Sequence, residues 1–233
     1  MAKRKSASYM TPGEQIAGTV FFVIYLVVLP FAMMAAKAGE IGWTAFWQTI
    51  SEPNVLAAVW LSLRMSFYAM LTNIVFGTLV AWVLVRYEFP GKNLVNALVD
   101  LPFALPTAVT GIALATLYAP NGWLGRWFAP FDIKIAFTPI GIWIALVFVS
   151  LPFIVRAVQP VLEELPAEYE EAAATLGAGR FTALRRVLLP EIMPALLTGS
   201  GMMFARATGE YGSVIFIAGD GVGNSAADYH RQA

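Results

Sequence analysis

The chain has 233 residues, of which 58% are hydrophobic and 13% charged, and its mean hydropathy is +0.67. This composition is far more apolar than that of a soluble domain, so we expect an integral membrane protein. The net charge of +0 and the lack of a basic stripe argue against nucleic acid as a partner. Without cysteine, and with His230 as the one histidine, the sequence predicts neither a disulfide nor a metal site.

Five apolar stretches approach or exceed the length of about 20 residues with which a helix crosses a bilayer. Four of them carry no charge and cover residues 17–36, 66–85, 101–119 and 135–155, and the fifth, at 192–218, contains two charged residues. Strand-like alternation is absent, and backbone exposed to lipid must satisfy its own hydrogen bonds. We therefore predict an all-α, polytopic membrane protein with five spans. The first apolar run is too long for the core of a signal peptide, which indicates a retained span.

The distribution of lysine and arginine predicts the orientation of the chain. With the N-terminus in the cytoplasm, nine of these residues fall on the inside and five on the outside. We therefore expect a cytoplasmic tail at 1–16 and a membrane domain at 17–219, with a polar cytoplasmic segment at 160–190. The last stretch, 220–233, is too short and too polar to form another span.

The polar segment contains the sequence EEAAATLGAGRFTALRRVLLP at 170–190. Pro166 and the glutamates that follow it suit the start of a helix, while Gly177 and Gly179 suit its end. Tyr169, Ala172, Ala173 and Leu176 share one face at helical spacing. We expect a second short helix from about Phe181 and the start of the fifth span at Pro190. From spacing alone, the segment is either a solvated connection or a docking element for another protein.

The same segment resembles the EAA motif of permease subunits in bacterial binding-protein-dependent ABC importers. The motif residues, in chain order, are Glu171, Ala172, Ala173, Gly177, Leu189 and Pro190, and Val187 stands where isoleucine is usual. The resemblance implies a type I ABC importer permease fold. It also implies that these six residues form the coupling site for a separate ATP-binding subunit.

Residues 101–125 and 204–220 are similar to the T-type permeases of sulfate/thiosulfate importers, with the molybdate permeases as close relatives. The resemblance implies a bacterial inner-membrane subunit, surrounded by membrane lipid. Its implied partners are a second homologous permease in a heterodimer, two ATP-binding subunits and a periplasmic sulfate-binding protein. The sequence lacks a phosphate-binding GxxxxGK[ST] loop, so we expect no cofactor on this chain, with ATP and Mg used by the partner. A membrane-embedded enzyme is disfavoured because the spans contain no paired acids, histidines or Ser/His/Asp set.

The third predicted span contains a first group of candidates for the translocation path. Pro102 and Pro106 each remove a backbone donor, and Thr107 and Thr110 lie close by. Irregular backbone at membrane depth is tolerated where it is buried in protein or lines a watery cavity. These residues therefore either line the path or pack between helices, where small and hydroxyl side chains also gather.

Arg206 and Glu210, in the fifth predicted span, form a second group. They lie one helical turn apart and share a face, so they are able to pair. Counted from Ile192 at ~1.5 Å per residue, Arg206 lies roughly 21 Å along the span, toward its outer side. Its planar guanidinium is suited to an incoming oxyanion. The alternative is a structural Arg–Glu pair.

The resemblance implies six spans where this chain has five. We therefore expect a product that is truncated at its C-terminus or frameshifted beyond Asp220. Two alternatives to a sulfate importer stay open at this point. One is a molybdate or tungstate importer, and the other is an inactive truncated product that docks the ATPase without transporting.

Overall fold

The computed structural model describes residues 11–40, 42–166 and 168–218, which form helices and, within these ranges, no strand. This confirms the all-α prediction. Four helices are long and apolar enough to cross a membrane, or five if one bent helix pair counts as a single span. The tail at 220–233 and most of the tail at 1–16 lie outside the described residues. The chain divides into two units, Met1–Leu56 and Ala57–Ala233, which are described separately.

The first unit is built from an uninterrupted helical rod and one shorter helix. The rod comprises α1 (Pro12–Val23), a π-helical turn η1 (Ile24–Val28) and α2 (Leu29–Glu40), and α3 covers Trp43–Ile50. Thr11 caps the rod, because its hydroxyl accepts from the Glu14 amide while the Glu14 carboxylate accepts from the Thr11 amide. The rod agrees with the first predicted span and extends it at both ends.

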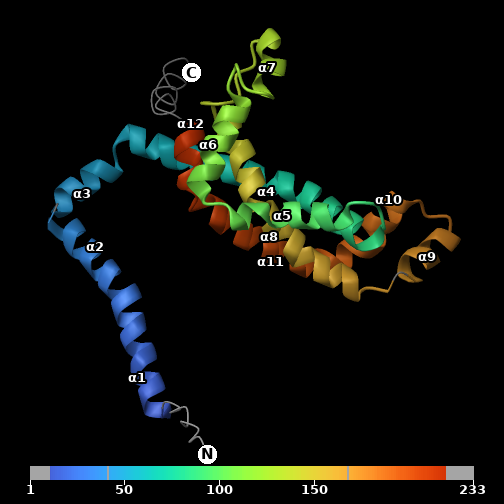
Figure 1. The fold of residues 1–233 in the computed structure, drawn as a ribbon, viewed down its shortest axis with the longest axis horizontal. Helices are drawn as coiled ribbons and strands as arrows, with labels where there is room; N and C mark the ends of the chain where they lie inside the picture. Colours follow the sequence, from blue (N-terminus) through green and yellow to red (C-terminus); the bar gives the residue numbers. More distant parts are fainter. Residues whose placement is uncertain (1–10, 41, 167, 219–233) are drawn as a thin grey trace, which may run out of the picture. The chain divides into compact units, whose positions relative to one another are not determined.

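The second unit is a bundle in which α8 contacts α5, α6, α11 and α12 (Figure 1). Its membrane-length helices are α4 (Pro53–Arg86, which begins in the first unit), α8 (Pro139–Glu164) and α11 (Leu189–Thr208), with shorter α5 (Lys92–Ala104), α6 (Thr107–Tyr118) and α12 (Gly212–Ala218). A hairpin with α7 (Gly125–Phe128) and the 3₁₀ turn η2 (Ala129–Phe131) joins α6 to α8. Leu146, Ile154 and Leu162 of α8 are fully buried, so α8 forms the centre of the core.

Small and polar side chains bring α4 close to α8. A row of buried residues runs along α4 at steps of three or four: Ser66, Ala69, Asn73, Gly77 and Ala81. A Cβ placed on Gly77 would lie 2.8 Å from Cγ2 of Ile154. Asn73 Nδ2 donates to the Val147 carbonyl oxygen at 2.9 Å. Such rows of small residues allow the close approach of membrane helices, which here replaces a hydrophobic driving force that lipid does not supply.

The third predicted span differs from the structure, because it is not one helix. α5 and α6 meet at a bend of 113°. The break is at Leu105, which is extended (φ −91°, ψ 135°), followed by Pro106 as the N-cap of α6. Proline disfavours helical backbone in the residue before it, which explains the position of the break. Pro102, one turn earlier, is accommodated inside α5.

The fifth predicted span also begins elsewhere than expected. The residues after Gly179 form one continuous helix made of α10 (Arg180–Ala183), the π-helical turn η3 (Leu184–Leu188) and α11. The separate short helix and the start of a span at Pro190 were therefore wrong. Leu184 and Leu188 are buried and anchor this early part of the helix to the bundle. At the other end, the span is broken between Thr208 and Gly212, where α12 begins.

Candidate functional site

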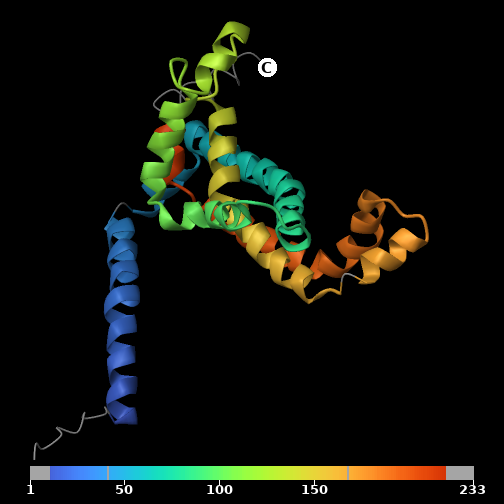
Figure 2. The same cartoon turned by 45° about the vertical axis from the view of Figure 1, so that its right-hand side comes forward.

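The predicted coupling segment forms a short helix, α9 (Glu168–Thr175), followed by a glycine turn. Gly177 has φ +83°, a left-handed conformation that glycine adopts without a Cβ clash. Around it, the Ala178 amide donates to the Ala173 carbonyl oxygen at 3.0 Å, which closes the helix end. α9 lies beyond the end of α8 in both Figures 1 and 2. The helix and its glycine stop are as predicted.

The apolar face predicted for α9 is divided in the structure. Ala173 is buried toward α10 and η3, which α9 contacts. Tyr169 and Ala172 are exposed, and Leu176 is 89% exposed. Within the motif, Glu171 and Gly177 are exposed as well, whereas Leu189 and Pro190 lie in the helix that leads into the bundle. The exposed side of α9 is therefore a small surface of mixed apolar and acidic character, to which the motif contributes Glu171, Ala172 and Gly177.

Arg86, the last residue of α4, ties this segment to the bundle. Its Nε donates to the Glu170 carboxylate, and its Nη2 donates to the Leu165 carbonyl oxygen at 2.9 Å. The two side chains are 14% and 21% exposed. Sequence reasoning missed this pair, because the partners are 84 residues apart and no periodic pattern connects them.

A second ion pair joins α5 to α8. Arg156 Nε and Nη2 donate to the two carboxylate oxygens of Asp100 at 2.8 and 2.6 Å, and Nη1 donates to the Asn96 side-chain oxygen at 2.9 Å. A two-pronged Arg–carboxylate contact fixes orientation as well as distance. It therefore holds α5 against α8 before the chain bends at Leu105.

The residues proposed for the translocation path lie where α5 bends into α6. Pro102 is buried, Pro106 is exposed and Thr107 is half-buried. Thr110 is 2% exposed, and its hydroxyl has no hydrogen-bond partner among the described residues. Thr107 also approaches α12, because a Cβ on Gly212 would lie 2.1 Å from its Oγ1. Thr107 is thus closely packed against α12.

Gly111 lies one turn after Thr107 on α6 and also packs against α12, where its neighbour is Ser213. A Cβ on Gly111 would meet the Ser213 backbone oxygen at 2.6 Å, so Gly111→Ala is expected to destabilise the bundle by about 1–3 kcal/mol. Gly201→Ala is the matched control: its Cβ would meet nothing within 4 Å inside α11, and alanine favours a helix over glycine by up to ~1 kcal/mol. Thermal unfolding in detergent should move in opposite directions for the two variants; equal shifts would contradict the packing of α6 on α12.

Arg206 and Glu210 contact each other at the end of α11, as their spacing predicts. Arg206 Nη1 donates to Glu210 Oε2, while Glu210 Oε1 accepts from the Ser213 amide at 2.7 Å and from the Ser213 hydroxyl at 2.9 Å. The Glu210 side chain is 2% exposed and that of Arg206 33%. Glu210 is therefore enclosed and holds the first turn of α12, whereas Arg206 keeps an accessible edge.

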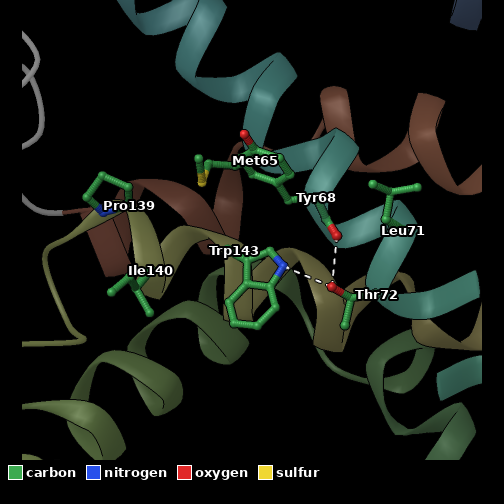
Figure 3. A pocket seen from close by; sticks show the side chains of 7 residues that line it. All are labelled: Met65, Tyr68, Leu71, Thr72, Pro139, Ile140 and Trp143. Carbon is green, nitrogen blue, oxygen red and sulfur yellow. Dashed lines mark hydrogen bonds between the residues drawn. The ribbon is translucent and has the colours of Figure 1, made fainter. Parts of the chain in front are cut away.

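A groove of about 430 Å³ opens between α4 and α8 (Figure 3). Its lining consists of Met65, Tyr68, Leu71, Thr72, Pro139, Ile140 and Trp143. Trp143 Nε1 donates to Thr72 Oγ1 at 3.3 Å, which in turn donates to the Tyr68 carbonyl oxygen at 2.8 Å. The lining is mainly apolar and contains no charged residue, and Trp143 Nε1 is already engaged by Thr72, so the groove lacks the set of free donors that an oxyanion needs. In the described part of the chain, no group of three or more metal-ligating side chains comes together.

Comparison with known proteins places this bundle among transporters. The family described as "Binding-protein-dependent transport system inner membrane component" matches residues 73–228. The chain belongs to this family. It is similar to the sulfate transport system permease protein CysT of Escherichia coli (strain K12), with 49% identity over 217 residues, or 92% of this chain and 78% of that protein. The CysT protein of Synechocystis sp. is 51% identical over 200 residues, or 86% of this chain and 70% of that protein.

A solved structure supports the fold of this family member. The crystal structure of a bacterial ABC transporter involved in the import of the acidic polysaccharide alginate matches with a TM-score of 0.72. The match covers 91% of this chain and 79% of the other, at 16% sequence identity. Because the identity is low, this match establishes the shared permease fold alone.

Membership of the family establishes the general role of the chain. It is a multi-pass inner-membrane component of a transport system and not an enzyme. The family of permeases in binding-protein-dependent ABC importers implies a partner ATPase that hydrolyses ATP and a substrate-binding protein.

Proposed function

We propose that this chain is the permease subunit of an ATP-driven importer that carries sulfate and thiosulfate across the bacterial inner membrane. The observation that carries the proposal is its identity of 49% and 51% to two proteins named as sulfate transport permeases, over most of the chain. The other members of the complex would be a second, homologous permease, two ATP-binding subunits that use ATP and Mg, and a periplasmic sulfate-binding protein. The N-terminus would lie in the cytoplasm.

The proposed coupling site lies on α9 and on the helix that follows it. Glu171, Ala172 and Gly177 form its exposed part and would contact the ATPase directly. Ala173 supports α9 from within, and Leu189 and Pro190 would join the site to α11. A small alanine at the centre of the exposed side is consistent with close approach of a partner surface.

The experiment that tests the proposal is uptake of radiolabelled sulfate into a strain that lacks its own T-type permease, with and without this chain. Sulfate uptake that thiosulfate suppresses is the expected result. Suppression by molybdate at lower concentration than by thiosulfate would favour a molybdate or tungstate importer. Co-purification of the ATPase without uptake would identify a chain that docks its partner without transporting.

The bend between α5 and α6 is proposed to line the translocation path, together with Arg206. Its support is the extended backbone at Leu105 and Pro106 and the buried, unpartnered hydroxyl of Thr110. Polar groups of this kind at membrane depth suit a cavity wall. Pro102 and Thr107 flank the bend on either side.

Replacing both Thr107 and Thr110 with valine tests whether their hydroxyls line the translocation path. The double variant retains side-chain volume but loses two hydroxyls, so sulfate uptake should fall several-fold while the amount of purified complex stays constant. Thr116→Val is the control, because Thr116 is exposed on α6 and its hydroxyl donates to the Ile112 carbonyl oxygen within the same helix. Uptake by the double variant equal to that of the control would contradict a role in transport for the hydroxyls of Thr107 and Thr110.

A further inference from the structure

We propose that Arg86 is a positioning residue that locks the coupling segment, residues 168–179, to the ends of both α4 and α8. The inference rests on the proposed docking of an ATPase at α9. It adds a mechanical link: movement of the docked segment would pass to two membrane helices through one guanidinium group.

The first observation is the geometry of the guanidinium. Its Nε is in contact with the Glu170 carboxylate of α9, while its Nη2 lies 2.9 Å from the carbonyl oxygen of Leu165, the C-cap of α8. Arginine presents these donors in a rigid planar fork, so the two contacts fix the directions of both partners relative to α4. A lysine ammonium would keep the charge but not this fixed fork.

The second observation concerns the end of α8. The last carbonyl groups of a helix lack partners within it and carry partial negative charge. The last turn of α8 contains no basic residue of its own. Arg86 supplies the missing cation from α4, so the ends of the two helices are held together where the coupling segment begins.

The third observation is that neighbouring glutamates of α9 face different surroundings. Glu170 is 21% exposed at its side chain and is turned toward Arg86, whereas Glu168 and Glu171 are exposed. The segment can therefore present Glu171 to a partner while Glu170 holds it to the bundle. Glu170 and Glu171 therefore have the same side chain but different contacts.

The fourth observation is how little else of α9 is embedded. Among its described side chains, Ala173 alone is buried, and its packing neighbours are α10 and η3. These neighbours lie on the helix that continues into α11. The hydrogen bond that joins α9 to α4 is the Arg86–Glu170 contact, so its loss should free α9 from α4 while α9 stays packed on α10 and η3.

Two measurements on the 233-residue chain test the proposal. The chain has no cysteine, so spin labels attach only at cysteines introduced for the first measurement. Spin labels on Leu176→Cys and Val75→Cys, both exposed in the wild type, report the distance between α9 and α4. The second measurement is the ratio of sulfate transported to ATP hydrolysed in the reconstituted complex, without labels. A residue needed for folding alone would change the amount of complex and leave this ratio intact.

Arg86→Gln is expected to broaden the label distance distribution and to lower the transport ratio by roughly 2- to 30-fold, the range for residues that carry coupling between sites. Arg86→Lys should give an intermediate ratio. Glu170→Gln removes the negative charge that Arg86 contacts and leaves α4 unchanged. If Arg86→Gln fails to fold, this variant tests the proposal in its place. Lys92→Gln is the matched control, because it also removes a cation near the end of α4, and the ion pair of Lys92 is with Glu88, four residues earlier in the chain.

Unchanged label distances and an unchanged ratio in folded Arg86→Gln, or in Glu170→Gln, would overturn the proposal. Failure of the wild-type chain to retain the ATPase would instead contradict the docking of the ATPase at α9. The label distances would still report in that case whether Arg86 holds α9 to α4, so the two failures are distinguishable.

Discussion

Replacing Arg206 with glutamine is expected to abolish sulfate uptake while the permease still assembles with its partners. The guanidinium of Arg206 lies in the last turn of α11, and its side chain is 33% exposed. Glu210 is hydrogen-bonded to its Nη1 nitrogen. The neutral amide of glutamine lacks the positive charge and the planar fork of donors with which arginine attracts an oxyanion. Charged residues within membrane segments are rare and are functional candidates by default, so the presence of Arg206 in the last turn of a membrane-length helix supports a role in transport. Uptake of radiolabelled sulfate measures the effect, with the yield of purified complex as the measure of assembly.

Glu210→Gln separates transport from structure in the same experiment. Glutamine can still accept from the Ser213 amide, while Arg206 keeps its charge and loses its counter-ion. We expect this variant to retain part of its uptake. If instead Arg206→Gln and Glu210→Gln both reduce the yield of complex and leave uptake per complex unchanged, Arg206 serves the structure of the bundle alone.

The second large effect is expected at Ala172, on the exposed side of α9. Ala172→Gln should weaken retention of the ATPase by roughly 5- to 150-fold, because extra atoms in a closely packed contact cost about 1–3 kcal/mol. The folded permease itself should be unaffected, since Ala172 is exposed. Co-purification of the ATPase with the permease, over a series of ATPase concentrations, measures the change.

Ala174→Gln is the matched control for this prediction. Ala174 is exposed on the same helix but about 200° away from Ala172 around its axis, at 3.6 residues per turn. It should leave ATPase retention close to the wild-type value. Equal losses for the two alanine variants, or none for either, would contradict a docking surface centred on Ala172.

The exposed side of α9 shows where sequence patterns were sufficient. The helix follows from the glutamates at its start and from its alanines, and its end follows from Gly177, because these effects act within a few residues. Leu176 is a boundary case: the sequence placed it in an apolar stripe, and the structure leaves it 89% exposed. A stripe indicates an apolar face but not whether the same chain covers it.

Helix continuity was less predictable than helix existence. Pro102 and Pro106 have the same residue type and lie in one apolar stretch, but Pro102 is accommodated inside α5 and Pro106 begins α6 after the bend. Pro190 was expected to mark a start, yet the helix runs through it from α10 into α11. Whether a proline bends a helix depends on what packs around it, and this information is not local.

The sequence by itself determined the membrane class, the helical fold, the approximate spans and the motif on α9, because each follows from composition or from spacing within one helix. The spacing of Arg206 and Glu210 likewise indicated their contact. Only the tertiary structure decided which charges meet across helices: Arg86 with Glu170, and Arg156 with Asp100. The physical reason is that these pairs form between segments 56 and 84 residues apart, which become neighbours only when the bundle packs.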